Sequence, residues 1–136
     1  MKWLFKEEPT HFPYDELVEN GRTDWAGVKN PVAQKHLRAV AKGDSIFYYH
    51  TGKEKAVVGV AKADSQPYPD SGDPNGKRVV VDIVPVRKLK RPVTLAELKA
   101  SGRFATFDLT RLPRLSVMPV TDAQWAEIER MAKSDP

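Results

Sequence analysis

The chain has 136 residues, of which 40% are hydrophobic and 29% charged, and these values indicate a single domain, 1–136, with one core. No stretch approaches the roughly 18–20 apolar residues of a membrane span, the charged N-terminus is not expected to be a secretory signal, and the absence of cysteine excludes disulfides and favours a cytoplasmic location. The net charge of +4, with a pI near 9.3, favours a polyanionic partner, and the three scattered histidines lack the spacing of metal ligands.

The first residues predict a strand followed by a short helix. The segment KWLFKEE (2–8) is rich in apolar and aromatic residues, which is typical of a strand, and Pro9 stops it. Residues 13–21 (PYDELVENG) predict a helix. Its proline suits the first helical turn, and Gly21 suits the left-handed position after the last turn.

A second helix is predicted from Asn30 to Gly43. Asn30 is a good N-cap, Pro31 is favourable at the first helical position, and Gly43 is expected to end the helix. The apolar residues at helical spacing share one face: Ala33, Leu37, Val40 and Ala41. The opposite face is basic and carries Lys35, Arg38 and Lys42.

The middle of the chain predicts three strands. Residues 45–50 (SIFYYH) and 56–63 (AVVGVAKA) are strand-like and are separated by a loop of hairpin size. Residues 64–76 are rich in Pro, Gly, Asp and Ser and predict a loop. Residues 77–90 predict a long strand in a curved, mostly buried sheet, and Pro85 indicates an edge or a bulge.

Two late helices have complete start signals. Thr94 with Glu97 and Thr121 with Gln124 have the spacing of capping boxes, and residues 111–120 between the helices predict a last strand. Each box is flanked by a hydrophobic staple, formed by Val93 with Leu98 and by Val120 with Trp125. The expected fold is therefore an α+β domain, in which five or six strands curl into a pseudo-barrel with short peripheral helices.

Trp25 stands in a predicted loop directly before the helix that Asn30 caps. Loops carry binding residues more often than cores do. A flat indole beside free backbone N–H groups can stack a nucleobase while these groups hold oxygen atoms. The alternative is that Trp25 covers one end of the barrel, and the residues alone do not separate the two. Capping fully explains Asn30, although a capped helix also aims its N-terminus at whatever lies in front of it.

Strand 45–50 carries a second group of aromatic residues. Alternation places Tyr48 and His50 on one side of the strand and Tyr49 on the other. Ordinary packing in a barrel, with polar tips in water, explains them. A pocket wall is the alternative.

Charged residues mark two strand ends. Alternation places Lys6 and Glu8 on one face, where they could contact the polar edge of a nucleobase, act as an acid–base pair, or form an exposed ion pair of little value. The basic run RKLKR (87–91) could contact phosphates, or it is a solvated strand end.

Six blocks in this order resemble the EVE domain family: WLFKEEP (3–9), WAGVKNPVAQKHLR (25–38), DSIFYYHTG (44–52), VVGVAKADSQPYPD (57–70), VDIVPVRKLKRPVTLAELK (81–99) and RLSVMPV (114–120). The resemblance implies a PUA-like fold. It also implies a non-catalytic nucleic-acid-binding domain that reads a modified base, namely a modified cytosine in DNA or a modified base in RNA. The base would be flipped into a pocket of aromatic and polar groups. No cofactor, metal or membrane partner is implied.

Carried over position by position, the resemblance implies a base pocket formed by Lys6, Glu8, Trp25, Val28, Asn30, Tyr48, Tyr49, His50, Thr51, Tyr68, Arg114 and Ser116. Phosphate contacts are expected from Lys29, Lys35, Arg38, Arg87 and Lys88. The chain departs from the family pattern at Glu7, where a hydroxyl residue is common, and at Lys29, where arginine is common.

Two other functions are open on the sequence. The PUA-like ASCH proteins hydrolyse acylated cytidine with a lysine, a hydroxyl residue and a glutamate. Lys6 and Glu8 could fill two of these roles in a small enzyme that acts on a modified nucleoside, whereas Glu7 stands at the nearest position for the hydroxyl. A protein-interaction module is the third reading, and the absence of a large apolar stripe gives it little support.

Overall fold

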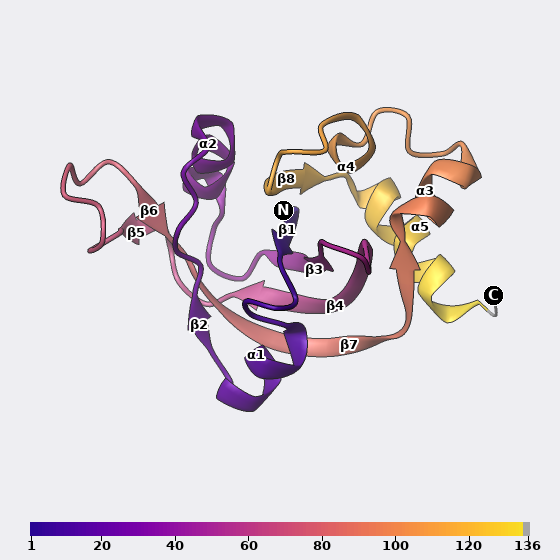
Figure 1. The fold of residues 1–136 in the computed structure, drawn as a ribbon, viewed down its shortest axis with the longest axis horizontal. Helices are drawn as coiled ribbons and strands as arrows, with labels where there is room; N and C mark the ends of the chain where they lie inside the picture. Colours follow the sequence, from indigo (N-terminus) through magenta and orange to yellow (C-terminus); the bar gives the residue numbers. More distant parts are fainter. Residues whose placement is uncertain (135–136) are drawn as a thin grey trace.

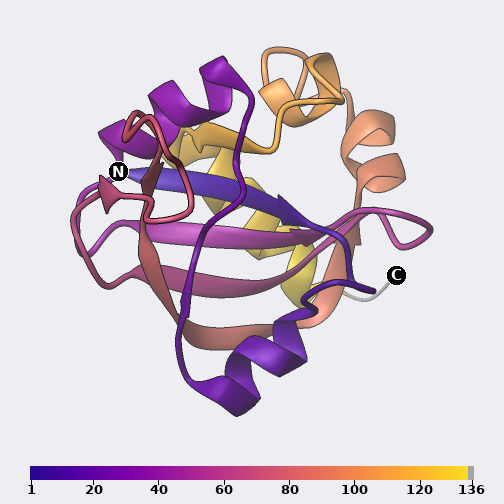
Figure 2. The ribbon, with the colours of Figure 1, turned by 60° about the vertical axis from the view of Figure 1, so that its left-hand side comes forward.

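The computed structural model describes residues 1–134 and arranges them around one curled sheet (Figures 1 and 2). The sheet has six strands in the order β2-β7-β4-β3-β1-β8, and β1 with β3 is its parallel pair. These strands are β1 (Lys2–Glu7), β2 (Thr23–Asp24), β3 (Ser45–His50), β4 (Ala56–Ala63), β7 (Asp82–Thr94) and β8 (Val117–Val120). A separate two-stranded ribbon pairs β5 (Tyr68–Pro69) with β6 (Val79–Val80). The predicted α+β class, with a curled sheet and short helices, is confirmed.

Within residues 1–134, five short helices surround the sheet, and Figure 1 shows the last three gathered at one side of it. They are α1 (Tyr14–Asn20), α2 (Pro31–Ala39), α3 (Leu95–Ser101), α4 (Asp108–Arg111) and α5 (Asp122–Lys133). Both predicted capping boxes are present, at the start of α3 and of α5. None of the helices within residues 1–134 has the length and apolar character needed to cross a bilayer.

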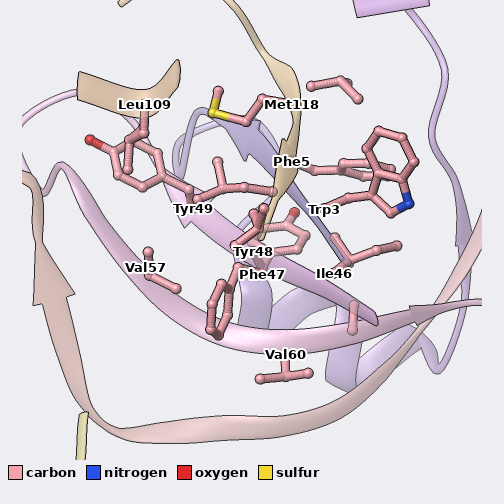
Figure 3. Packing of buried hydrophobic residues seen from close by; sticks show 14 of the residues in the cluster. Trp3, Phe5, Ile46, Phe47, Tyr48, Tyr49, Val57, Val60, Leu109 and Met118 are labelled. Atoms are coloured by element: carbon pink, nitrogen blue, oxygen red, sulfur yellow. The ribbon is translucent and has the colours of Figure 1, made fainter. Parts of the chain in front are cut away.

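The core is built on both faces of β3, and several of its side chains are shown in Figure 3. Phe47 stacks on Trp125 of α5, with ring centroids 3.6 Å apart and planes inclined by 12°. Tyr48 points to the other face, where its ring lies 5.4 Å from the ring of Trp25 and 5.4 Å from that of Tyr14. The alternation predicted for this strand is therefore confirmed, and it gives the sheet two packed faces.

The sheet bends where β4 pairs with β7. The pairing register shifts between Val57 and Gly59 and again between Val60 and Ala61, which lies opposite Pro85. At the first shift one residue of β4 stands against four of β7, and at the second β7 has one extra residue, Val86. Such irregularities increase the local twist. Of the two alternatives that Pro85 indicated, an edge or a bulge, the structure has the bulge, and these bends help to curl the sheet around its core.

The predicted end of the second helix is wrong. α2 ends at Ala39, and Val40 is already extended. Val40 is buried nonetheless, because the turn that follows is fixed by tertiary contacts. The Asp44 carboxylate there accepts hydrogen bonds from the Ala41 N–H and from the Trp3 indole, both at 2.9 Å. Val40 thus extends the buried face past the last helical residue, whereas Ala41, predicted on the same face, is exposed.

Other predicted boundaries also moved. Residues 111–116 are not a strand, because Arg111 ends α4 and a loop leads to β8. The predicted loop 64–76 contains β5, and the long strand starts at Asp82 and runs to Thr94. The two-residue strand β2 was not predicted. Its pairing with β7 depends on a partner far away in the sequence.

Candidate functional site

Two surface hollows open at the C-terminal end of β1, and a third shares Pro113 with one of them. The tryptophan hollow, of about 240 Å³, is lined by Glu7, His11, Phe12, Thr23, Asp24, Trp25 and Ala26. The lysine hollow, of about 350 Å³, is lined by Lys6, Tyr49, Thr51, Gly52, Lys55, Leu95, Lys99, Leu109, Thr110 and Pro113. The apolar hollow, of about 360 Å³, is lined by Asn30, Val32, Leu112, Pro113, Arg114 and Leu115. Since successive residues of a strand point to opposite faces, Lys6 and Glu7 face different hollows.

Trp25 both packs in the core and lines a hollow. Only 5% of its surface is exposed, and its ring centroid lies 5.3 Å from that of Phe5 and 5.4 Å from that of Tyr48. Its backbone N–H donates to the carbonyl of Val81 at 2.8 Å, which continues the β2–β7 pairing. The two alternatives drawn from the sequence are therefore compatible, because the core packing fixes the indole at the hollow.

One side of the tryptophan hollow presents hydrogen-bond acceptors. The Glu7 carboxylate accepts from the Glu8 N–H at 2.9 Å, and its other oxygen lies 3.3 Å from Nδ1 of the exposed His11. Within residues 1–134, the side chain of Asp24 has no hydrogen-bond partner. The residues that line this hollow include no lysine or arginine. Its polar side therefore favours a ligand group that donates hydrogen bonds.

The segment after Trp25 presents backbone donors instead. Gly27 has a φ of +79°, which turns the chain toward α2. Among the described residues, no acceptor takes the backbone N–H groups of positions 27–30. The segment is nevertheless held in place, because the carbonyl of buried Val28 accepts from Gln34 at 2.8 Å. These N–H groups follow a residue that lines the tryptophan hollow and are available to oxygen or nitrogen acceptors of a ligand.

Asn30 starts α2 as predicted. Its Oδ1 accepts from the N–H groups of Val32 and Ala33, at 2.9 and 3.0 Å. The capping role uses the oxygen of the amide and leaves the Nδ2 group as a donor. Asn30 and Arg114 line the apolar hollow together, so the structure brings these two predicted site residues to one place.

The lysine hollow holds a second group of predicted residues. Lys6 donates from Nζ to the carbonyl of Pro113 at 2.9 Å and lies 5.7 Å from the centre of the Tyr49 ring. Burial lowers the pKa of the Lys6 ammonium because it removes water from the charge. Thr51 donates its hydroxyl hydrogen to the Glu8 carboxylate. Figure 3 shows Tyr49 beside Leu109, which lines the same hollow. Lys6, Tyr49, Thr51 and Glu8 are therefore neighbours.

Tyr48 and His50 have structural partners instead. The Tyr48 side chain is fully buried and donates its hydroxyl hydrogen to the Phe12 carbonyl. His50 accepts the N–H of Tyr14 through Nε2 at 3.0 Å. Tyr14 is the first residue of α1, and the N-cap of that helix makes no side-chain bond of its own. Neither Tyr48 nor His50 lines one of the three hollows. His50, from β3, instead caps the first N–H group of α1.

Tyr68 lies near the rim of the tryptophan hollow without lining it. Its hydroxyl donates to Asp82, and this bond raises the pKa of Tyr68 to about 12. Asp82 is paired with Asp24 in the β2–β7 ladder. Tyr68 is therefore connected through Asp82 to Asp24, which lines the hollow.

The cations predicted to contact phosphate divide into two groups. On β7, Arg87 pairs with Glu129 of α5 and Lys88 pairs with Asp15 of α1. The cations near α2 are exposed and form no ion pair within the described part of the chain: Lys29, Lys35, Arg38 and, from the loop before β8, Arg114. Of these, Arg38 donates to the carbonyl of Lys77 at 2.9 Å.

Ser116, in the loop before β8, uses its backbone carbonyl to accept the Lys6 N–H at 2.9 Å.

Sequence reasoning missed several residues of the tryptophan hollow. Alternation along β1 could have placed Glu7 opposite Lys6, and Asp24 could have been found beside Trp25. His11 and Phe12 gave no signal in the sequence, because only the turn after β1 brings them beside Glu7 at the end of that strand. Their N–H groups both donate to the Glu8 carbonyl at 3.0 Å.

Comparisons with known proteins agree with this architecture. The EVE domain profile matches residues 1–131. Human thymocyte nuclear protein 1 is 29% identical in an alignment that covers 98% of this chain and 75% of the human protein. The structure of human THYN1 protein in complex with 5-methylcytosine containing DNA has a TM-score of 0.91 at 29% identity and covers 99% of each chain. Rpa0253 from Rhodopseudomonas palustris has a TM-score of 0.92 at 42% identity, covering 96% of this chain and 92% of that one.

A more distant likeness concerns the fold alone. ASCH from Zymomonas mobilis has a TM-score of 0.59 at 12% identity, and the match covers 96% of this chain and 94% of that one.

The profile match and the relatives that cover nearly the whole chain confirm what the six sequence blocks indicated. The chain belongs to the EVE domain family.

Proposed function

We propose that this chain binds DNA that carries a modified cytosine, flips the modified base into the tryptophan hollow, and catalyses no reaction on it. The observation that supports this most is the likeness to human THYN1 protein, whose structure contains 5-methylcytosine DNA and matches 99% of this chain with a TM-score of 0.91. RNA that carries a modified base is the alternative ligand, and the binding experiment described below compares its affinity with that of the DNA.

The chemistry of the hollow suits a flipped cytosine. Flipping costs a few kcal/mol, which stacking and edge hydrogen bonds must recover. Trp25 and Phe12 supply aromatic surface, and the carboxylates of Glu7 and Asp24 can accept from the N4 amino group. The backbone N–H groups of positions 27–30 have no acceptor within residues 1–134 and follow Ala26, which lines the hollow.

Phosphates would be bound mainly from the side of α2. Lys29, Lys35, Arg38 and Arg114 are exposed there without ion pairs in residues 1–134. Arg87 and Lys88 would have to give up their partners Glu129 and Asp15 before they could contact phosphate. We therefore assign the main electrostatic contribution to the first group. Because bound cations release counterions from DNA, the affinity is expected to fall with salt.

We expect the protein to bind a duplex with one 5-methylcytosine more tightly than the same duplex without the methyl group. Fluorescence anisotropy at several salt concentrations measures both affinities, and an RNA of the same sequence carrying 5-methylcytosine is the third ligand. The logarithm of the affinity should fall by roughly 0.9 per phosphate contact for each tenfold rise in salt. Equal affinity for both duplexes at all salt concentrations would refute the proposal.

One observation favours a second candidate, the hydrolysis of a modified nucleoside. The hydroxyl that the sequence did not supply near Lys6 is present, because Thr51 lines the same hollow as Lys6 and is hydrogen-bonded to Glu8. A lysine with a lowered pKa, a hydroxyl and a carboxylate are a set that can support acyl transfer. This set lies on the other side of β1 from the tryptophan hollow.

If base reading is the function, no turnover is expected. The test is incubation with a panel of N4-acylated and other modified cytidines, followed by chromatography and mass detection. Product that is formed by the wild type and lost in both Lys6→Ala and Thr51→Val would establish the hydrolase instead. The variant Lys42→Ala is the control for loss of a positive charge, since Lys42 is exposed and lines none of the three hollows.

A further inference from the structure

We propose that Glu7 makes the tryptophan hollow selective for bases with a cytosine-type edge and excludes thymine and uracil. The proposal rests on the proposed function, because it assigns a discriminating residue to the same site. It concerns the polar edge of the base and not its methyl group.

The position of Glu7 supports this role. It is the last residue of β1, and its side chain lines the hollow together with Trp25 and Asp24. One oxygen accepts the Glu8 N–H at 2.9 Å, which orients the carboxylate. The other lies 3.3 Å from Nδ1 of His11, a side chain that is 78% exposed and therefore replaceable as a partner. Each carboxylate oxygen has a second lone pair that can accept a further hydrogen bond.

The surrounding groups match one kind of base edge. An ionised carboxylate only accepts hydrogen bonds. Cytosine presents an amino donor at N4 and acceptors at N3 and O2, whereas thymine presents an oxygen at the corresponding position 4. Glu7 would accept from the amino group of cytosine, a donor that thymine lacks at this position. A thymine in the same orientation would place its O4 against the Glu7 carboxylate, and two acceptors would be left facing each other.

Nearby cations do not cancel this selectivity. No lysine or arginine lines the tryptophan hollow, and Lys6, the neighbour of Glu7 in the strand, faces the lysine hollow. The charge of Glu7 also opposes the entry of a phosphate group. The backbone of the nucleic acid is therefore expected outside this hollow, and a base is expected inside it.

The test compares two bases that share the C5 methyl group and differ in their polar edge. Oligonucleotides carry 5-methylcytosine or thymine opposite an abasic position, so that neither base has a pairing partner to lose. Wild-type protein is expected to favour 5-methylcytosine roughly tenfold or more, which is the size of one good edge contact. In Glu7→Gln the ratio should fall to about one or reverse, because the amide nitrogen can donate to O4.

Two further variants complete the test. Glu7→Thr, whose hydroxyl both donates and accepts, should also lose the discrimination, and it serves if Glu7→Gln does not fold. Glu19→Gln is the matched control, since Glu19 is exposed on α1 and the change removes the same charge without touching the hollow. Circular dichroism melting checks that each variant is folded.

The outcomes separate the inference from the proposed function. If folded Glu7→Gln or Glu7→Thr keeps the wild-type ratio, or if wild type does not distinguish the two bases, the inference is overturned. A comparison of 5-methylcytosine with unmodified cytosine on wild type tests the reading of the methyl group separately. Equal binding there would refute modified-base reading while the role of Glu7 in selecting cytosine could still stand.

Discussion

Trp25→Ala is expected to lower the free energy of unfolding by about 3–5 kcal/mol, the usual cost of removing a large buried aromatic side chain. Trp25 is 95% buried and contacts the rings of Phe5 and Tyr48, so the truncation leaves a cavity in the packed face beside the tryptophan hollow. Urea denaturation followed by circular dichroism measures the loss. A variant with the urea midpoint of the wild type would show that the indole contributes little to the core.

This stability loss decides how binding by Trp25 variants must be interpreted. If the indole also stacks the flipped base, its truncation should weaken binding by roughly 1–3 kcal/mol in addition. Trp25→Phe keeps a ring and is the better variant for separating the two effects. Trp125→Ala is the matched control, because that indole stacks on Phe47 against the opposite face and lines none of the three hollows. It should reduce stability and leave the affinity of the folded protein unchanged.

Gly59→Ala is expected to destabilise the protein by about 1–3 kcal/mol or more, because it overpacks a filled core. A Cβ at this position would lie 2.5–2.7 Å from three ring atoms of Tyr14. The ring cannot swing away easily, since it is 99% buried and its hydroxyl donates to the Val60 carbonyl at 2.7 Å. Because the φ of Gly59 is not positive, the cost is steric and does not come from the backbone.

A double-mutant cycle tests this explanation. Tyr14→Leu removes the ring that the new methyl group would meet. On this account the two substitutions together should cost clearly less than the sum of their separate losses. Urea denaturation of the wild type, both single variants and the double variant gives the coupling energy. Additive losses would show that the Tyr14 ring is not what excludes a side chain from position 59.

Local signals predicted the parts of the fold that depend on neighbouring residues. The capping boxes at Thr94 and Thr121 and the cap at Asn30 form as the sequence indicated, because each joins groups within three residues. The end of α2 was not predictable in this way. It depends on Asp44, whose contacts include Trp3, a residue 41 positions away in the sequence.

The candidate site was predicted only in part, because local sequence patterns associate only residues that are close along the chain. Trp25 and Asn30 stand in one short segment, so the sequence could associate them. Thr51 and Glu8 come from different segments that are brought together by the parallel pairing of β1 with β3. The family resemblance implied a pocket role for His50, and the fold gives it a structural partner, the first helical N–H of α1.

The sequence by itself therefore determined the family, the α+β class, the helix starts and the presence of Trp25 beside a capped helix. These depend on composition, on contacts within a few residues, or on motifs that keep their order along the chain. Only the tertiary structure decided that Glu7 shares a hollow with Trp25 and that Lys6 faces another. It also decided that Arg87 and Lys88 are held by carboxylates of α5 and α1. Those arrangements depend on the curl of the sheet and on pairings between distant segments, which local sequence patterns do not encode.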